Sequence, residues 1–307
     1  MTELDRLEPR IRESVEQFIR AGRPSARLQT FEERREGYLA TIDLAGEAEP
    51  VWRIEDFKFD EVQLRIYRPL DESNLPVMIY FHGGCFVSGD LETHDRQMRQ
   101  LANQGRCLVV AVHYRLAPEY RYPAAHDDAV KAIRIIREQA SAWGGNPDKL
   151  TLAGDSAGGH IAIVTSLRLK SEGLSWLQRL ILIYPMLDAK GSSKSYDQYG
   201  DDYIVTRDML LSGFEAYFEG NTTPEHPEAS PLYRDDLAGL PDTHILTAEF
   251  DPLVDEGEEL YRRLLKAGVN AQCQRYLGVN HGFFQLGGIS QAGHKAIGDV
   301  AALMRSW

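Results

Sequence analysis

Hydrophobic and polar positions along the chain change between two periods, and this change predicts an alternation of strands and helices. Short apolar runs, typical of buried strands, are separated by longer segments in which apolar residues return every three or four positions. The strand-like runs cover residues 77–81, 108–112, 149–153, 180–184, 244–248 and 271–277. The helix-like segments are found at 93–104, at 125–139 and after residue 156. Such alternation predicts a mostly parallel central sheet covered by helices on both faces.

Three parts of the chain depart from this alternation. Residues 52–59 and 62–68 alternate like an antiparallel strand pair. Residues 188–230 are polar and rich in Gly, Ser, Asp and Tyr, with one apolar helix near 209–218, and this composition predicts a surface insertion. Near the N-terminus, an amphipathic helix is predicted by apolar residues at helical spacing, namely Leu4, Leu7, Ile11, Val15 and Phe18.

One tight turn carries a candidate nucleophile. Ser156 is the centre of Gly154-Asp155-Ser156-Ala157-Gly158, which matches the pattern G-x-S-x-G between a predicted strand and a predicted helix. The turn forces the serine into strained φ and ψ angles, and small neighbours let the strand and the helix approach closely. Because a serine hydroxyl is a poor nucleophile by itself, the motif predicts a base and an acid elsewhere in the chain.

Candidates for the acid and the base follow later in the chain, each just past a predicted strand. Asp251 comes after residues 244–248, and His281 comes after residues 271–277. Both therefore belong to the edge at which parallel sheets place their sites. Asp255 is an alternative acid, although the start of a helix explains an acidic residue at that position by itself.

A fourth candidate feature is the turn His82-Gly83-Gly84-Cys85, which follows the predicted strand at 77–81. The turn is similar to H-G-G-G, a motif whose backbone amides stabilise the oxyanion formed in acyl transfer. Cysteine stands where that motif has its third glycine, and cysteine tolerates a positive φ poorly. Two interpretations of Cys85 are open: it is a small residue tolerated in a glycine loop, or its side chain faces the same space as the amides.

Three polar residues near these motifs have structural interpretations. We expect His82 to hold its own loop by hydrogen bonding, and we expect Asp155, the variable position of the serine turn, to be structural. His160 lies on the helix after the turn, so it should point away from Ser156. An arginine beside a strand end, such as Arg115, usually anchors a loop.

Taken together, the motifs resemble those of the bacterial hormone-sensitive-lipase-like carboxylesterases, which have the α/β-hydrolase fold. The similarity runs from about residue 77 to the C-terminus. Besides the turns above, it includes Tyr114-Arg115-Leu116-Ala117-Pro118-Glu119, Asp251-Pro252-Leu253 and His281-Gly282-Phe283. The order Ser, Asp, His along the chain is the order of that fold.

The resemblance implies a role for each candidate. Ser156, Asp251 and His281 would be the catalytic triad, and the oxyanion hole would consist of the backbone amides of Gly83, Gly84 and Ala157. The resemblance also implies a helical cap over the site. The expected organisation is an N-terminal cap segment at 1–48, a core at 49–187, a cap insertion at 188–230 and the rest of the core at 231–307.

Composition restricts the partners and the compartment. The net charge of −12 argues against binding to nucleic acid or to anionic lipid. We find neither the apolar stretch of a membrane span nor a signal peptide. Three cysteines without paired spacing favour a reducing, cytoplasmic compartment. Neither a metal-ligand cluster nor a phosphate-binding loop is visible, so we expect no metal and no cofactor.

We therefore predict a serine carboxylesterase that hydrolyses a small-molecule ester with a short acyl chain. Two alternatives remain at this point. An amidase or a formamide hydrolase would use the same triad, and a ligand-binding member of the fold would have lost the histidine that this chain retains as His281. The sequence leaves the natural substrate open, and it leaves open whether the protein is a monomer or a homodimer.

Overall fold

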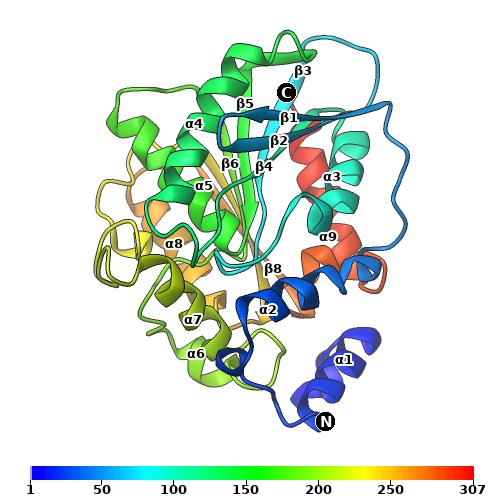
Figure 1. Cartoon of the computed structure of the whole chain (residues 1–307), viewed down its shortest axis with the longest axis vertical. Coiled ribbons are helices and arrows are strands. Elements are labelled where there is room, and N and C mark those ends of the chain that lie inside the picture. The colour runs from blue at the N-terminus through cyan, green and yellow to red at the C-terminus, as the bar shows by residue number, and fades with distance from the viewer. Residues whose placement is uncertain (1) are drawn as a thin grey trace.

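The computed structural model describes residues 2–307 and contains an eight-stranded sheet between two layers of helices (Figure 1). The strand order is β1-β2-β4-β3-β5-β6-β7-β8. The strands are β1 (Arg53–Phe59), β2 (Val62–Arg68), β3 (Leu75–Phe81), β4 (Leu108–His113), β5 (Gly145–Asp155), β6 (Leu177–Ile183), β7 (Asp242–Phe250) and β8 (Ala271–Asn280). Strand β2 pairs with both β1 and β4 in antiparallel fashion, and all pairs from β4 to β8 are parallel. The predicted mostly parallel sheet is thus confirmed.

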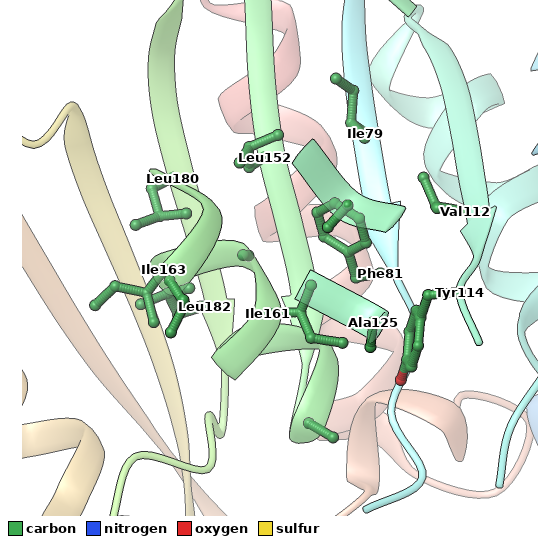
Figure 2. Packing of buried hydrophobic residues seen from close by; sticks show 14 of the residues in the cluster. Ile79, Phe81, Val112, Tyr114, Ala125, Leu152, Ile161, Ile163, Leu180 and Leu182 are labelled. Carbon is green, nitrogen blue, oxygen red and sulfur yellow. The ribbon is translucent and has the colours of Figure 1, made fainter. Parts of the chain in front are cut away.

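Helices cover both faces of the sheet, as the alternating pattern predicts. One face is covered by α4 (Ala124–Gln139), α5 (Ala157–Ser171) and α8 (Val254–Lys266), and the other by α3 (Leu91–Gly105) and α9 (Gln291–Arg305). Successive strand residues point to opposite faces. In β3, Ile79 and Phe81 therefore pack toward α5, beside Ile161 (Figure 2), whereas Met78 and Tyr80 pack with residues of α3 and α9.

Two helical segments outside these layers lie at the same end of the molecule (Figure 1). The first contains η1 (Glu3–Arg6), α1 (Pro9–Arg20), η2 (Ala26–Leu28), α2 (Phe31–Leu39) and η3 (Ile42–Ala45). The second contains α6 (Lys194–Tyr199) and α7 (Arg207–Phe218). Further turns are η4 (Pro231–Tyr233) and η5 (Phe283–Gln285). We call these two helical segments the cap.

The N-terminal segment differs from the single amphipathic helix that its spacing predicts. The helix is interrupted after Arg6, and α1 begins at Pro9. Proline has no backbone N–H to donate, so it fits the first turn of a helix and not the interior of one. Ile11 and Val15 are nevertheless buried as expected. The sequence pattern also misses α2, because the helix carries five charged residues and no continuous apolar stripe.

Charged contacts join the two parts of the cap. Arg27 of η2 contacts Asp208 and donates to Glu215 Oε1 at 2.8 Å, and both acids belong to α7. Ser25 also contacts Asp208, and Arg23 contacts Asp202. These side chains are partly exposed, so each ion pair contributes modestly to stability, about 0–1 kcal/mol.

Candidate active site

Ser156 occupies a strained turn between β5 and α5. Its backbone has φ 54° and ψ −116°, which is unusual for a residue with a side chain. Two glycines permit this turn. A Cβ on Gly158 would lie 1.9 Å from the carbonyl oxygen of Phe81, and one on Gly154 would lie 2.4 Å from the backbone of Gly158. Any larger residue would push the turn away from β3, so the sequence pattern G-x-S-x-G has a direct steric cause here.

The structure brings Ser156, His281 and Asp251 together. His281 Nε2 lies 3.0 Å from Ser156 Oγ, and His281 Nδ1 lies 2.8 Å from Asp251 Oδ2. Each residue directly follows the carboxyl end of a strand: β5, β8 and β7, respectively. All three are buried, and Asp251 also accepts a hydrogen bond from the amide of Leu253 at 2.8 Å.

The alternative acid makes a different contact. Asp255 Oδ2 accepts from the backbone amide of Ser195 at 3.0 Å and thereby fixes the start of α6. Of the two acids, Asp251 is the one that contacts the histidine.

This arrangement can activate the serine. When Nδ1–H of His281 donates to Asp251, the lone pair of Nε2 points toward the Ser156 hydroxyl and can accept its proton. The buried carboxylate keeps the ring in that tautomer and stabilises the imidazolium that follows proton transfer.

The loop after β3 presents backbone amides beside Ser156. They differ from the amides that the resemblance implied at one residue, Gly83. The Gly83 amide donates to Asp155 Oδ1 at 2.9 Å, so it is engaged within the protein. Among residues 2–307, the amides of Gly84 and Cys85 have no protein acceptor. The expectation for Gly83 is therefore corrected: this amide fixes the loop and does not point at the site.

Positive φ angles shape this loop. Gly84 has φ +125°, and a Cβ there would lie 2.1 Å from the carbonyl oxygen of Ser88. Cys85 and Phe86 follow with φ 53° and 65°, a conformation that costs a residue with a side chain about 1 kcal/mol or more. The amides of Val87 and Ser88 close the turn on the Gly84 carbonyl, at 3.1 and 3.0 Å. The cysteine is thus held in the conformation that a glycine would adopt freely.

Asp155 holds this loop in place by hydrogen bonds, which agrees with the structural role predicted for it. Its carboxylate accepts from the Gly83 amide, from Tyr80 Oη at 2.9 Å and from Gln285 Nε2 at 2.7 Å, and His94 Nε2 lies 3.1 Å away. Burial, reinforced by the Asp155 charge, raises the pKa of Tyr80, which therefore remains a donor. The sequence analysis missed Gln285. Its only signal is its position four residues after His281, at the end of η5.

Three other residues behave as predicted from their motifs. His82 Nδ1 lies 2.8 Å from the carbonyl oxygen of Gly83, within its own loop. His160 is directed away from Ser156, because its two ring nitrogens lie 2.9 Å from the carbonyl oxygens of Met186 and Glu228. Burial lowers the pKa of His160 to about 4. Arg115 Nη2 donates to Asp128 Oδ1 at 2.7 Å and anchors the loop after β4 to α4.

A cavity of about 350 Å³ opens above the serine. Its floor includes Ser156 and His281, and the loop after β3 contributes Gly84 and Cys85. Both parts of the cap supply walls, which include Arg34, Tyr38, Ile204, Val205 and Met209. Cys85 is buried among the residues that line this cavity, and burial raises the pKa of its thiol.

Within residues 2–307, no group of three His, Cys, Asp or Glu side chains is arranged to hold a metal ion. In the same range, no helix combines the length and the apolar character needed to cross a membrane. Cys85, Cys107 and Cys273 are free thiols.

A serine in a strand-turn-helix elbow, followed by an acid and a histidine after later parallel strands, defines an α/β-hydrolase. The comparisons with known proteins agree with this class. A family model described as alpha/beta hydrolase fold matches residues 78–285. An arylesterase of Saccharolobus solfataricus is 33% identical over 282 residues, which are 90% of this chain and 92% of that protein.

Two further relatives are similar over nearly the whole chain. An ethyl acetate hydrolase of Pseudomonas putida is 34% identical over 288 residues, which are 89% of this chain and 91% of the relative. The solved structure of an esterase from Pyrobaculum calidifontis superposes with a TM-score of 0.91 at 36% identity and covers 98% of each chain. The chain belongs to the hormone-sensitive-lipase-like family of α/β-hydrolases and is a carboxylic ester hydrolase.

Proposed function

We propose that this esterase hydrolyses short-chain esters through an acyl-enzyme formed on Ser156. The observation that carries the proposal is the pair of hydrogen bonds that joins Ser156 to His281 and His281 to Asp251 at the floor of a small cavity.

In this mechanism, His281 Nε2 takes the proton of Ser156 as Oγ attacks the ester carbonyl carbon. The carbonyl oxygen becomes an oxyanion, which accepts hydrogen bonds from the backbone amides of the loop and of the elbow. His281 then gives the proton to the leaving alcohol as the carbon–oxygen bond breaks. A water molecule, activated by the same histidine, releases the acid and restores Ser156.

The amides of Gly84, Cys85 and Ala157 are the donors we assign to the oxyanion. Those of Gly84 and Cys85 have no acceptor among residues 2–307, and that of Ala157 opens α5, where helix amides are free to bind an anion. Gly83 acts indirectly: its amide does not donate to the oxyanion, but its hydrogen bond to Asp155 fixes the loop that carries Gly84 and Cys85.

Two observations support a short acyl chain. The cavity of about 350 Å³ lies at the small end of the range for ligand sites, roughly 300–1,000 Å³. In addition, one relative is named for ethyl acetate, an ester with a two-carbon acyl group. A long acyl chain would need space that the cap helices occupy.

The test is the initial rate on 4-nitrophenyl esters with acyl chains from two to twelve carbons, with Ser156→Ala as the blank. We expect kcat/KM to be highest for the shortest chains and to fall by about tenfold or more beyond eight carbons, since each buried methylene that does not fit forfeits about 0.8 kcal/mol. A maximum at ten or more carbons would contradict the proposal. Matched anilides distinguish the amidase alternative, because equal rates on anilide and ester would favour it.

A further inference from the structure

Arg34 is a buried cation in the wall of the catalytic cavity. It lies on α2, and only 8% of its surface is exposed. Its guanidinium donates to Ser212 Oγ at 3.1 Å and to the carbonyl oxygen of Met209 at 3.3 Å, both on α7. Arg34 therefore bridges the two parts of the cap through neutral acceptors.

Arg34 differs from the other arginines of its segment because no carboxylate among residues 2–307 forms an ion pair with it; Glu33 also lines the cavity, but it accepts from the Thr30 amide. Arg27 contacts Asp208 and Glu215, and Arg35 donates to Glu119 at 2.7 Å. Among residues 2–307, no carboxylate lies within salt-bridge distance of Arg34. A charge that is removed from water without a partner is costly, so a buried guanidinium usually has an anion beside it.

Arg34 lines the cavity that contains Ser156 and retains unused donors. A guanidinium has five N–H groups, and the two acceptors on α7 leave part of this fork unused. Arg34 lines the same cavity as Ser156 and His281, and it is the only lysine or arginine among the described residues that do so. Its charge also reaches the loop beside Ser156: burial raises the pKa of Cys85, and Arg34 acts in the opposite direction.

We propose that Arg34 determines specificity by binding a carboxylate carried by the ester substrate. The substrate class would be small anionic esters, either half-esters of a dicarboxylic acid or acyl esters of a hydroxy acid. A planar guanidinium binds a carboxylate through two parallel hydrogen bonds, which adds orientation as well as affinity. In a chain with a net charge of −12, a local cation is what such a substrate requires. The proposal rests on the function proposed above.

The first test compares matched substrates. On the acyl side, mono-4-nitrophenyl glutarate is paired with 4-nitrophenyl pentanoate. On the alcohol side, the acetyl ester of 3-hydroxybutyrate is paired with the acetyl ester of 2-butanol. The quantity measured is the ratio of kcat/KM for the anionic ester to that for the neutral ester, which cancels any general loss of activity.

We expect Arg34→Gln to lower this ratio about ten- to a hundredfold for one of the two pairs, the range expected for a charge-assisted hydrogen bond. The affected pair identifies the side of the ester that carries the carboxylate. Arg34→Lys keeps the charge and should retain part of the preference for the anionic ester. Arg20→Gln is the matched control, because it makes the same charge change on the exposed face of α1 and should leave the ratio as it is. An unchanged ratio for both pairs in Arg34→Gln would show that Arg34 only fastens the cap.

A second test does not depend on turnover. Glutarate binding to the Ser156→Ala variant is measured by calorimetry, with pentanamide as the neutral control. The measurement is repeated with two double variants, one that combines Ser156→Ala with Arg34→Gln and one that combines it with Arg34→Lys. We expect at least tenfold weaker glutarate binding in the Gln variant. If no ester is hydrolysed but glutarate binds through Arg34, the proposed function fails and the anion site stands. If neutral esters are hydrolysed and glutarate does not bind, the anion site fails alone.

Discussion

The catalytic centre and the cap above it are held by different kinds of contact. At the centre, Asp155 and Asp251 are almost completely buried, and each carboxylate accepts hydrogen bonds from neighbours fixed at the ends of strands. In the cap, Arg23 and Arg27 meet Asp202, Asp208 and Glu215 at partly exposed positions. Buried charge-assisted bonds are strong, whereas exposed pairs are weak and screened by salt.

The difference separates chemistry from substrate choice. Catalysis needs donors that are already in place when the oxyanion forms, and the donors that we propose lie where several strands of the sheet end at one edge. The walls that meet the substrate, including Arg34 and Tyr38, come from the cap. A change in the cap can therefore alter which ester binds without moving the reacting groups.

The largest effect is expected from the triad. Ser156→Ala should lower kcat by about 10⁴–10⁶, His281→Ala nearly as much, and Asp251→Asn by less. Asp255→Asn is the matched control for the acid, since Asp255 contacts the Ser195 amide. Steady-state kinetics on an aryl acetate, with circular dichroism to verify folding, would check this. A greater loss of activity in Asp255→Asn than in Asp251→Asn, at equal stability, would reverse the assignment.

Acid should destabilise the core through His160. Its folded pKa of about 4 lies below its ordinary value of 6.5, so the unfolded state binds the additional proton. The free energy of unfolding should fall as pH decreases from about 6.5 to about 4, by on the order of 3 kcal/mol if only this group titrates. Urea unfolding at pH 7.5 and pH 5 measures the slope.

The control for this effect is His160→Gln, which cannot gain the proton. Its unfolding free energy should depend less on pH than that of the parent protein, although it will be lower overall because contacts with the Met186 and Glu228 carbonyls change. An identical pH dependence in both proteins would assign the acid sensitivity to other groups.

Weakening the hydrogen bonds between Asp155 and the loop after β3 should have an intermediate effect on kcat. Asp155→Asn removes the negative charge that accepts from the Gly83 amide and from Tyr80. Since a hydrogen bond to a charged group contributes about 1.5–3 kcal/mol, we expect kcat to fall roughly ten- to a hundredfold. Measuring kcat and KM separately shows whether the Asp155 carboxylate acts on the loop or on substrate binding. A rise in KM with kcat retained would mean that this carboxylate acts on binding and not on the loop.

The smallest effect on stability is expected in the cap. Arg27→Gln removes pairs with Asp208 and Glu215 that are partly exposed, and should lower the free energy of unfolding by less than about 1 kcal/mol. KM should nevertheless rise, because the two parts of the cap that wall the cavity are joined less firmly. Thermal unfolding and kinetics at low and high salt would test this. High salt should bring the parent protein closer to the variant, and a loss of kcat as large as that of Asp155→Asn would break the separation between the two regions.

Several elements could be predicted from the sequence because their causes are local or periodic. Apolar runs of the right length became the strands, as at β3 and β4, and the G-x-S-x-G pattern became the elbow because any Cβ on Gly158 would meet the Phe81 carbonyl. The cap helices were harder. The α2 helix has its own start signal, a capping box between Thr30 and Glu33, but no apolar stripe by which to recognise it.

The sequence by itself determined the order of the elements, the strand ends that carry Ser156, Asp251 and His281, and the two regions outside the sheet. These follow from side-chain period and from turn chemistry, which act over a few residues. Only the tertiary structure decided which amides face the site, because the Gly83 amide is taken up by Asp155, 72 residues away. It also decided that Arg34 meets neutral acceptors on α7, 178 and 175 residues further along the chain, and forms no ion pair within residues 2–307. Partnership between groups that are distant in sequence depends on packing, and no local pattern records it.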